Sequence, residues 1–170
     1  VVPSGRRLMG EPLNPAAAGG VEQGAASYER GRPSYPADTV AWLADGLGIG
    51  PGRRVLDLAA GTGKFTRLLV PSGADLVAVE PVAAMRAQFS AVLPDVEILD
   101  GTADHLPLPD DSVDVVTVAQ AFHWFDLPAA CAEIHRVLRP GGGLGLVWNE
   151  RDTSVPWVAE LSRIIRWDER

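Results

Sequence analysis

The chain has 170 residues, of which 46% are hydrophobic, enough for one domain with a buried core. Its formal net charge is −7 and it has no long basic run, which argues against a nucleic-acid backbone as the main partner. No segment approaches the roughly 20 apolar residues of a membrane span, and the N-terminus lacks the apolar region of a secretory signal. We therefore expect a cytoplasmic protein that binds neither nucleic acid nor a membrane.

Residues that bind metals or form disulfides are scarce. The single cysteine, Cys131, recurs at helical spacing with Ile134, Val137 and Leu138, which predicts a buried thiol rather than a nucleophile. The three histidines form no cluster with metal-ligand spacing, so we expect no metal site.

The N-terminal region divides into two parts. Residues 1–24 are rich in Gly, Ala and Pro and predict a mobile arm before a domain that occupies residues 25–170. Residues 37–47 predict a helix, because Val40, Leu43 and Leu47 share one face of it, and the Gly-rich residues 48–52 end it.

Residues 55–63 read VLDLAAGTG, an apolar strand followed by a Gly-rich turn, and residues 64–69 can begin a helix. Gly61 and Gly63 lack a Cβ atom, so the backbone can turn tightly and approach a ligand closely. Asp57 ends the strand and can accept hydrogen bonds, while the free N–H groups of a following helix favour an anion. The alternative is that the glycines only make a tight turn between a strand and a helix.

Residues 74–80 read ADLVAVE and predict a second strand that ends on Glu80. In a parallel βαβ unit the carboxyl ends of neighbouring strands lie side by side, which places Glu80 next to the Gly-rich turn. A carboxylate there can bind two ribose hydroxyl groups. A solvated charge at the end of a strand is the simpler alternative.

The remaining elements alternate as an α/β fold requires. The expected elements are a helix over 82–93, strands over 96–99 and 113–119, a helix over 127–138, a strand over 144–148 and a helix that begins near Pro156. The strand over 113–119 is apolar enough to be covered on both faces. Together they predict a doubly wound parallel sheet.

The AAGTG turn, the preceding Asp57 and the later segment GTADHLPLPDDSVDVVTV resemble class I S-adenosylmethionine-dependent methyltransferases. They are most similar to the small-molecule type that includes trans-aconitate methyltransferase-like proteins. The resemblance covers residues 28–149 and implies a Rossmann-like sheet of five parallel strands in the order 3-2-1-4-5. The family fold has a sixth and a seventh strand, for which we find no sequence. We therefore expect a C-terminally incomplete domain that self-associates through the exposed edge of the fifth strand and the C-terminal helix.

The resemblance also implies a cofactor site for S-adenosylmethionine. The residues that it assigns to this site are Asp57, Ala59, Gly61, Gly63, Glu80, Pro81, Thr102, Ala103, Asp104 and Gln120. The Gly-rich turn would pass the methionine part, Glu80 would bind the ribose, and Gln120 would lie near the transferable methyl group. Two positions depart from the family: Ala59 replaces the first glycine, where we expect an ordinary φ, and Thr102 replaces an adenine-binding Asp, with Asp104 as a candidate substitute.

The acceptor side is less well defined by the sequence. Tyr28, Arg32 and Tyr35 are candidate lid residues in the family, or else members of an ordinary surface segment. In the segment AQAFHWFD, His123 is the best candidate for a general base, or it packs between a strand and a helix. Trp124 can shape the pocket or favour the sulfonium by a cation–π contact.

Three functions stay open. The first is methyl transfer from S-adenosylmethionine to an O, N or C nucleophile of a small molecule. The second is a non-catalytic cofactor-binding or assembly fragment. The third is a nicotinamide-dependent oxidoreductase, disfavoured because Thr66 replaces the third glycine of that fingerprint and because Lys64, the only lysine, cannot form a Tyr-x-x-x-Lys pair.

Overall fold

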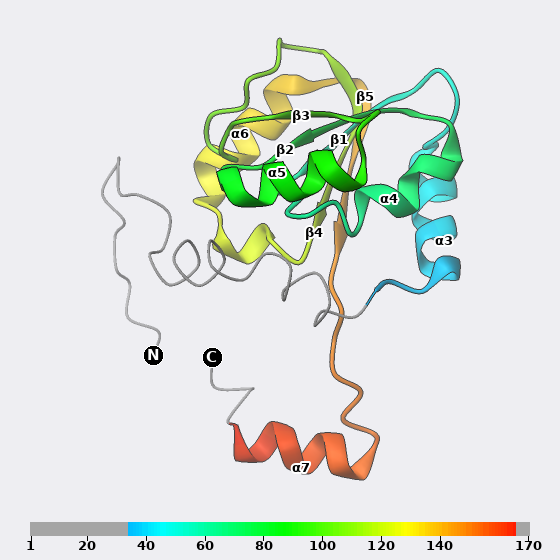
Figure 1. Cartoon of the computed structure of the whole chain (residues 1–170), viewed down its shortest axis with the longest axis vertical. Coiled ribbons are helices and arrows are strands. Elements are labelled where there is room, and N and C mark those ends of the chain that lie inside the picture. Colours follow the sequence, from blue (N-terminus) through cyan, green and yellow to red (C-terminus); the bar gives the residue numbers. More distant parts are fainter. Residues whose placement is uncertain (1–33, 166–170) are drawn as a thin grey trace.

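The computed structural model describes residues 34–165, which form one five-stranded sheet in the order β3-β2-β1-β4-β5 (Figure 1). Every strand pair is parallel, so the predicted fold class and strand order are confirmed. The strands are β1 (Arg54–Leu58), β2 (Asp75–Val79), β3 (Glu97–Leu99), β4 (Val113–Ala119) and β5 (Leu138–Val147). The strand order reverses between β1 and β4, and sheets of this kind bind ligands at the carboxyl ends of the strands at that point.

Helices connect the strands and cover the sheet (Figure 1). They are α3 (Ala37–Leu47), α4 (Thr66–Leu69), η1 (Val70–Ser72), α5 (Ala83–Val92), η2 (Phe122–Trp124), α6 (Leu127–Val137) and α7 (Pro156–Ile164). The helix predicted over 37–47 is confirmed, and it ends at Gly48 in the left-handed conformation. Asp126 caps α6 by accepting a hydrogen bond from the backbone N–H of Ala129, which explains where this helix begins.

Two hydrophobic clusters lie on the opposite faces of the sheet. On one face, Leu43 of α3 packs in a cluster with Val55 of β1. On the other face, Leu56 of β1 belongs to a cluster with Ile134 of α6. Because successive side chains of a strand point to opposite faces, a sheet covered on both sides needs the nearly continuous apolar runs that the sequence contains.

Strand β5 begins at Leu138, six residues before the predicted start at residue 144. Its first part consists mainly of Gly and Pro, which the sequence pattern favours for a turn. Here the glycines make room for helix α3: a Cβ atom on Gly143 or Gly145 would lie 2.8 or 2.7 Å from a methyl carbon of Leu47. The strand is therefore set by long-range packing rather than by local preference.

The helix expected directly behind the Gly-rich turn is short. Residues 61–65 form turns, α4 has only four residues, and the chain continues as the 3₁₀ helix η1, which contains Pro71. Proline has no backbone N–H and cannot continue an α-helix. The predicted attraction of an anion by a helix N-terminus is therefore weak here, because a four-residue helix has only a small dipole.

The prediction of a buried Cys131 is wrong, since this thiol is exposed. The buried face of α6 carries Ala130, Ile134 and Val137, which are spaced by four and three residues. Cys131 follows Ala130 directly, so it is rotated by about 100° from the centre of this face. Either set of positions satisfies helical spacing, and only the packing on the sheet distinguishes them.

After β5 the chain continues as an extended segment that ends in α7, apart from the sheet (Figure 1). Trp157 and Ile164 of α7 are 69% and 64% exposed. In residues 34–165, no helix is both long enough and apolar enough to cross a membrane. The predicted arm over 1–24 and the candidate lid residues Tyr28 and Arg32 lie outside the described residues.

Candidate functional site

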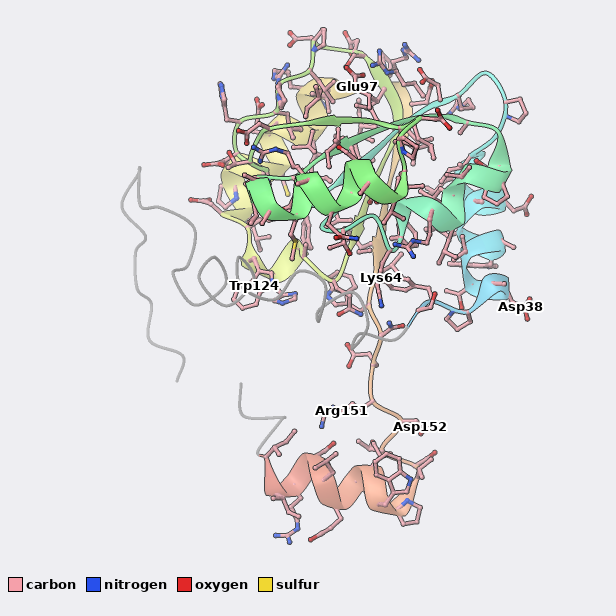
Figure 2. All side chains as sticks on the ribbon, viewed as in Figure 1. Asp38, Lys64, Glu97, Trp124, Arg151 and Asp152 are labelled. Carbon is pink, nitrogen blue, oxygen red and sulfur yellow. The ribbon has the colours of Figure 1, made fainter. Side chains whose placement is uncertain are left out.

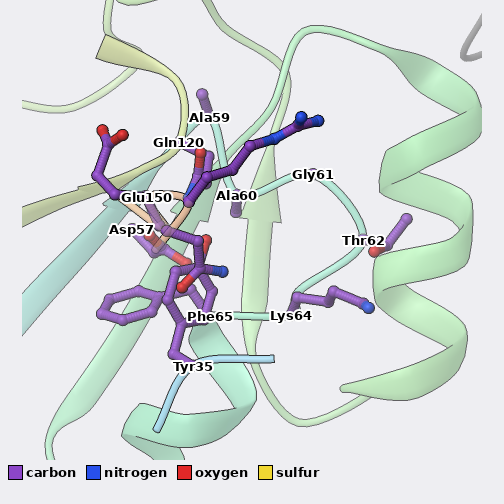
Figure 3. A pocket seen from close by; sticks show the side chains of 13 residues that line it. Tyr35, Asp57, Ala59, Ala60, Gly61, Thr62, Lys64, Phe65, Gln120 and Glu150 are labelled. Atoms are coloured by element: carbon purple, nitrogen blue, oxygen red, sulfur yellow. The ribbon is translucent and has the colours of Figure 1, made fainter. Parts of the chain in front are cut away.

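A cavity of about 410 Å³ opens at the carboxyl ends of β1 and β4 (Figure 3). Its walls come from the turn after β1, the end of β4 and the segment after β5. The lining residues are Tyr35, Asp57, Ala59, Ala60, Gly61, Thr62, Lys64, Phe65, Ala119, Gln120, Asn149, Glu150 and Arg151. This volume is typical of a site for a small organic molecule or a cofactor.

The turn after β1 forms one wall of the cavity with a left-handed backbone. Ala59, Gly61 and Gly63 have φ angles of 57°, 59° and 83°. Our expectation of an ordinary φ at Ala59 is therefore wrong, although its methyl group is accommodated. A residue with a Cβ atom is strained in this conformation by about 1 kcal/mol or more, so the structure maintains an unfavourable backbone at the cavity.

Gly63 serves packing rather than close approach to a ligand. A Cβ atom at this position would lie 2.8 Å from Cδ1 of Leu93 and 2.9 Å from Cδ2 of Phe89, at the end of α5. Gly63 does not line the cavity, whereas Gly61 does. The two glycines thus have different tasks: Gly61 faces the cavity and Gly63 lets α5 pack against the turn.

Asp57 is buried at the base of the cavity and joins three parts of the fold. Its side chain is acceptor to the hydroxyl groups of Thr66, at the start of α4, and Thr117, in β4, at 2.5 and 3.1 Å. Burial raises the pKa of Asp57 to about 6, because the hydrogen bonds from the two hydroxyl groups do not compensate for the lost hydration, and nearby Glu80 acts in the same direction. The carboxylate therefore holds the Gly-rich turn against β4.

Glu80 follows β2 and binds the same turn from the other side. Its carboxylate accepts the backbone N–H of Gly61 at 3.0 Å and that of Val82 at 2.9 Å. Burial raises the pKa of Glu80, opposed by these two hydrogen bonds and by Arg86, which donates to the Glu80 carbonyl oxygen at 2.8 Å. The predicted proximity of this acid to the Gly-rich turn is thus observed, but its oxygens bind backbone amides.

Gln120 comes from the end of β4 and lines the cavity opposite the turn. Its φ angle is 60°, again in the left-handed region. Its backbone N–H donates to the carbonyl oxygen of Val147 at the end of β5, at 2.8 Å. This hydrogen bond ties the position after β4 to the end of β5, and Figure 3 shows the Gln120 side chain among those that line the cavity.

Two further segments complete the cavity. Tyr35, which precedes α3, contacts Phe65 edge to face with ring centroids 5.1 Å apart. Both rings line the cavity, as do Asn149 and Glu150 after β5 (Figure 3). The lid residue predicted at position 35 therefore lies at the site.

The residues predicted to contact adenine lie in the loop after β3 and do not line this cavity. Thr102 pairs with His105 in an isolated bridge, Ala103 is buried in the core, and Asp104 is exposed. Pro81, beside Glu80, is half-buried and also lies outside the cavity walls. Their roles toward a cofactor stay predictions.

His123 and Trp124 form η2, just after the end of β4, with their ring centroids 4.9 Å apart. Nε1 of Trp148 donates a hydrogen bond to Nδ1 of His123 at 3.4 Å. An indole N–H is only a donor, so Nδ1 is unprotonated and the proton of the neutral imidazole lies on Nε2. The lone pair that would make His123 a base is therefore occupied in this arrangement.

The site offers no metal centre in residues 34–165, where no group of three or more His, Cys, Asp or Glu side chains is placed to hold a metal ion. What it offers is a cavity with a polar base, a strained turn and a set of aromatic rings at its rim. Cavities with these features are typical of binding sites for organic molecules.

The comparisons with known proteins agree with this geometry. The family described as a methyltransferase domain matches residues 56–146, from β1 to β5, and thus includes the turn, Glu80 and Gln120. The chain therefore belongs to this methyltransferase family.

Two relatives show how much of the chain is similar to known methyltransferases. The chain is 54% identical to an uncharacterized methyltransferase of Mycobacterium tuberculosis over 84% of its own length and 57% of that protein. It is 46% identical to a demethylmenaquinone methyltransferase of Mycolicibacterium paratuberculosis over 58% of this chain and 42% of that one. The chain thus covers 57% and 42% of the lengths of these two relatives, and so only part of each.

A solved structure shows the same fold. An S-adenosylmethionine-dependent methyltransferase from Mesorhizobium loti superimposes with a TM-score of 0.57 and 29% identity, over 65% of this chain and 55% of that one.

Several cavity residues were not among the predicted site residues. Thr62, Lys64 and Phe65 belong to the turn itself, so their position directly after Gly61 was a usable signal. Arg151 lies two residues beyond Asn149, in a segment without a regular pattern, and no sequence feature marks it. Trp148 was likewise missed, because its contact with His123 joins positions 25 residues apart.

Proposed function

We propose that this chain binds S-adenosylmethionine at the carboxyl edge of the sheet and transfers its methyl group to a small-molecule acceptor. The observation that carries the proposal is the cavity lined by the Gly-rich turn and Gln120, most of whose lining residues lie inside the region matched by the methyltransferase family. The Mesorhizobium loti relative, whose name specifies this cofactor, supports the same choice.

The residues present fit such a cofactor. Each oxygen of the Glu80 carboxylate accepts one backbone N–H and keeps a further lone pair, so the two oxygens can accept two ribose hydroxyl groups. Ala59 and Gly61 would hold the methionine part of the cofactor, and Thr102 and Asp104, which lie outside the cavity walls, would hold the adenine.

The chemistry requires alignment more than acid–base groups. S-adenosylmethionine supplies a methyl group on a sulfonium sulfur, which keeps the C–S electron pair when a lone pair of an O, N or C nucleophile forms the new bond to carbon. Gln120 and the turn around Ala59 hold the reacting end of the site, and Tyr35 with Phe65 excludes water from it. His123 and Trp124 lie on the acceptor side, next to the end of β4.

Calorimetric titration with S-adenosylhomocysteine and with NAD tests the proposal. We expect S-adenosylhomocysteine to bind and NAD not to bind. Binding of NAD alone would overturn the methyltransferase assignment in favour of an oxidoreductase. Methyl transfer from labelled cofactor to a metabolite extract separates an active enzyme from a fragment that only binds the cofactor.

Glu80→Gln tests the ribose contact. The amide keeps the shape of the side chain but removes the charge and one acceptor oxygen, so we expect the affinity for S-adenosylhomocysteine to fall about tenfold or more. Glu97→Gln is the matched control, because Glu97 is an exposed acid on β3 at the opposite edge of the molecule (Figure 2). Equal affinity of Glu80→Gln and the unmodified chain would refute the ribose assignment.

A second copy of the chain is the proposed partner at the outer edge of β5, and the cytoplasm is the proposed location. Within residues 34–165, β5 pairs only with β4, and its Leu144 and Leu146 are each 36% exposed. Unpaired strand edges with apolar side chains favour association. We expect dimers or larger species in sedimentation at micromolar concentration, and a stable monomer would contradict this proposal.

A further inference from the structure

Five rings gather at the carboxyl ends of β4 and β5. The ring of Phe122 contacts two others edge to face: its centroid lies 6.5 Å from that of Trp148 and 5.7 Å from that of Phe125. The ring centroids of His123 and Trp124 lie 4.9 Å apart. We call these five residues the aromatic shelf. Its members come from two segments, one after each strand, that only the folded sheet brings together.

Two rings of the shelf pack against the core, and two others are exposed to solvent. Phe122 and Phe125 pack against the hydrophobic core. Trp124 and Trp148, in contrast, are 53% and 39% exposed. Neighbouring exposed rings on a fixed base are typical of a surface that binds an apolar ligand.

The shelf is continuous with the cofactor cavity. Gln120, two residues before Phe122, and Asn149, directly after Trp148, both line that cavity. Trp124 and Lys64 lie on the same edge of the molecule (Figure 2). A ligand on the shelf would therefore lie beside the reacting end of the cofactor site.

One polar group accompanies the rings. Because Trp148 donates to Nδ1 of His123, the neutral imidazole carries its proton on Nε2. This Nε2 makes no hydrogen bond within residues 34–165. The shelf thus combines ring surfaces with an imidazole N–H donor, and Trp148 acts as the positioning residue that fixes this donor.

We propose that the shelf is the acceptor subsite and binds a planar aromatic ring that carries an ionised hydroxyl group. The ring stacks on Trp124 and Trp148, and the N–H on Nε2 of His123 donates to the phenolate oxygen. This inference rests on the proposed function and gives its acceptor a chemical class. An acceptor that ionises in solution arrives without the proton, so His123 has none to remove.

The test uses 4-nitrophenol, whose ionisation is visible by absorbance, added to the chain saturated with S-adenosylhomocysteine. We expect the bound probe to have a lower pKa than the free probe, because a donor favours the anion. Trp124→Ala should weaken binding about tenfold. Trp42→Ala is the matched control, since Trp42 is an exposed tryptophan on α3, and it should leave binding unchanged.

The role of Trp148 has a readout of its own. Trp148→Phe keeps a ring but removes the indole N–H, so binding should stay within about threefold while the lowering of the probe pKa disappears. His123→Gln retains an N–H donor and should retain the lowering, whereas His123→Ala should lose it. This pattern distinguishes a fixed donor from a merely structural ring.

Two results would overturn the inference: an unshifted pKa of the probe bound to the unmodified chain, or equal binding of the probe by Trp124→Ala. Because Trp124 is more than half exposed, its removal leaves the core intact, which circular dichroism checks. Failure of the proposed function has a different signature, namely no binding of S-adenosylhomocysteine. The probe titration is then repeated on the cofactor-free chain and tests the shelf alone.

Discussion

The acids at the carboxyl edge of the sheet differ from those elsewhere in the fold. Within residues 34–165, Asp57 accepts hydrogen bonds from two threonine hydroxyl groups and Glu80 from two backbone amides, and burial raises the pKa of both. Asp114, near the start of β4, accepts from the backbone N–H of Arg54 and from Arg139, which lower its pKa. On α6, hydrogen bonds from Arg136 hold the pKa of Glu133 at about 2.

The difference shows where the molecule is optimised for stability and where it is not. Away from the cavity, arginines compensate the buried carboxylates. At the cavity, the buried carboxylates accept hydrogen bonds from neutral hydroxyl and amide groups, which stabilise a charge less than arginines do. Ala59 and Gln120 also have left-handed backbone conformations there. Unfavourable terms of this kind concentrate at binding sites, where the surrounding fold maintains them.

The largest expected effect comes from breaking an arginine network. Arg136 donates to Glu133, to Asp110 and to the carbonyl oxygens of Leu106 and Leu108. Arg136→Ala leaves these acceptors without their donor, so we expect a loss of about 3 kcal/mol in the free energy of unfolding, measured by urea denaturation.

Arg136→Ala should leave the affinity of the folded chain for S-adenosylhomocysteine unchanged, because the network lies away from the cavity. Arg163→Ala is the control: its pair with Glu160 on α7 is exposed and should have no measurable effect on stability. A change in cofactor affinity with unchanged stability would contradict the division between the two regions.

The next effect is a pH dependence that belongs to Asp57. Because its folded pKa of about 6 exceeds the ordinary 3.8, the folded state binds a proton that the unfolded state has lost. Stability should therefore fall by about 3 kcal/mol as the pH rises from about 4 to about 6. Asp57→Asn should remove the part of the fall that Asp57 causes, measured by urea denaturation at both ends of the range, whereas Glu80, whose pKa burial also raises, still contributes in the same direction.

The opposite sign is expected for Glu133. Its folded pKa lies below the ordinary 4.5, so its contribution is present above that pH and is lost as the pH falls toward about 2. Glu133→Gln should therefore keep the loss between about pH 4 and 6 that Asp57 causes. If Glu133→Gln removed that loss, or Asp57→Asn kept it, the contrast between the two acids would be wrong.

The smallest effect concerns the backbone. Ala59→Gly removes a side chain that disfavours a φ of 57°, so we expect the free energy of unfolding to rise by about 0.5 to 1 kcal/mol. Gly48→Ala is the mirror control, since φ is 64° there with open space around the new methyl group, and it should cost about 1 kcal/mol. A lower urea midpoint for Ala59→Gly would show that the turn is not strained.

Local patterns predicted the strands and their ends well. The apolar run of β4 gave its bounds, 113–119, without error, because every side chain in a sheet covered on both faces must be apolar or hydrogen-bonded. The Gly-rich turn and Glu80 were placed side by side from the rule for parallel strands alone. Chain order and strand ends were therefore sufficient for the centre of the site.

What the sequence did not predict depends on contacts between distant segments. The course of β5 depends on Leu47, which packs over Gly143. The exposure of Cys131 depends on which face of α6 packs against the sheet. The left-handed Gln120 depends on a hydrogen bond to Val147. None of these partners lies within one turn or one hairpin, so residue preferences could not identify them.

The hydrogen bond from Thr117 to Asp57 joins residues that are 60 positions apart in the sequence. Closing so long a loop costs entropy that is recovered only when β1, β4 and β5 have all paired. We therefore expect the cavity to form late in folding, after β1, β4 and β5 have paired. Slow hydrogen exchange at the Gln120 amide, which Val147 protects, would mark the moment at which the protein becomes competent.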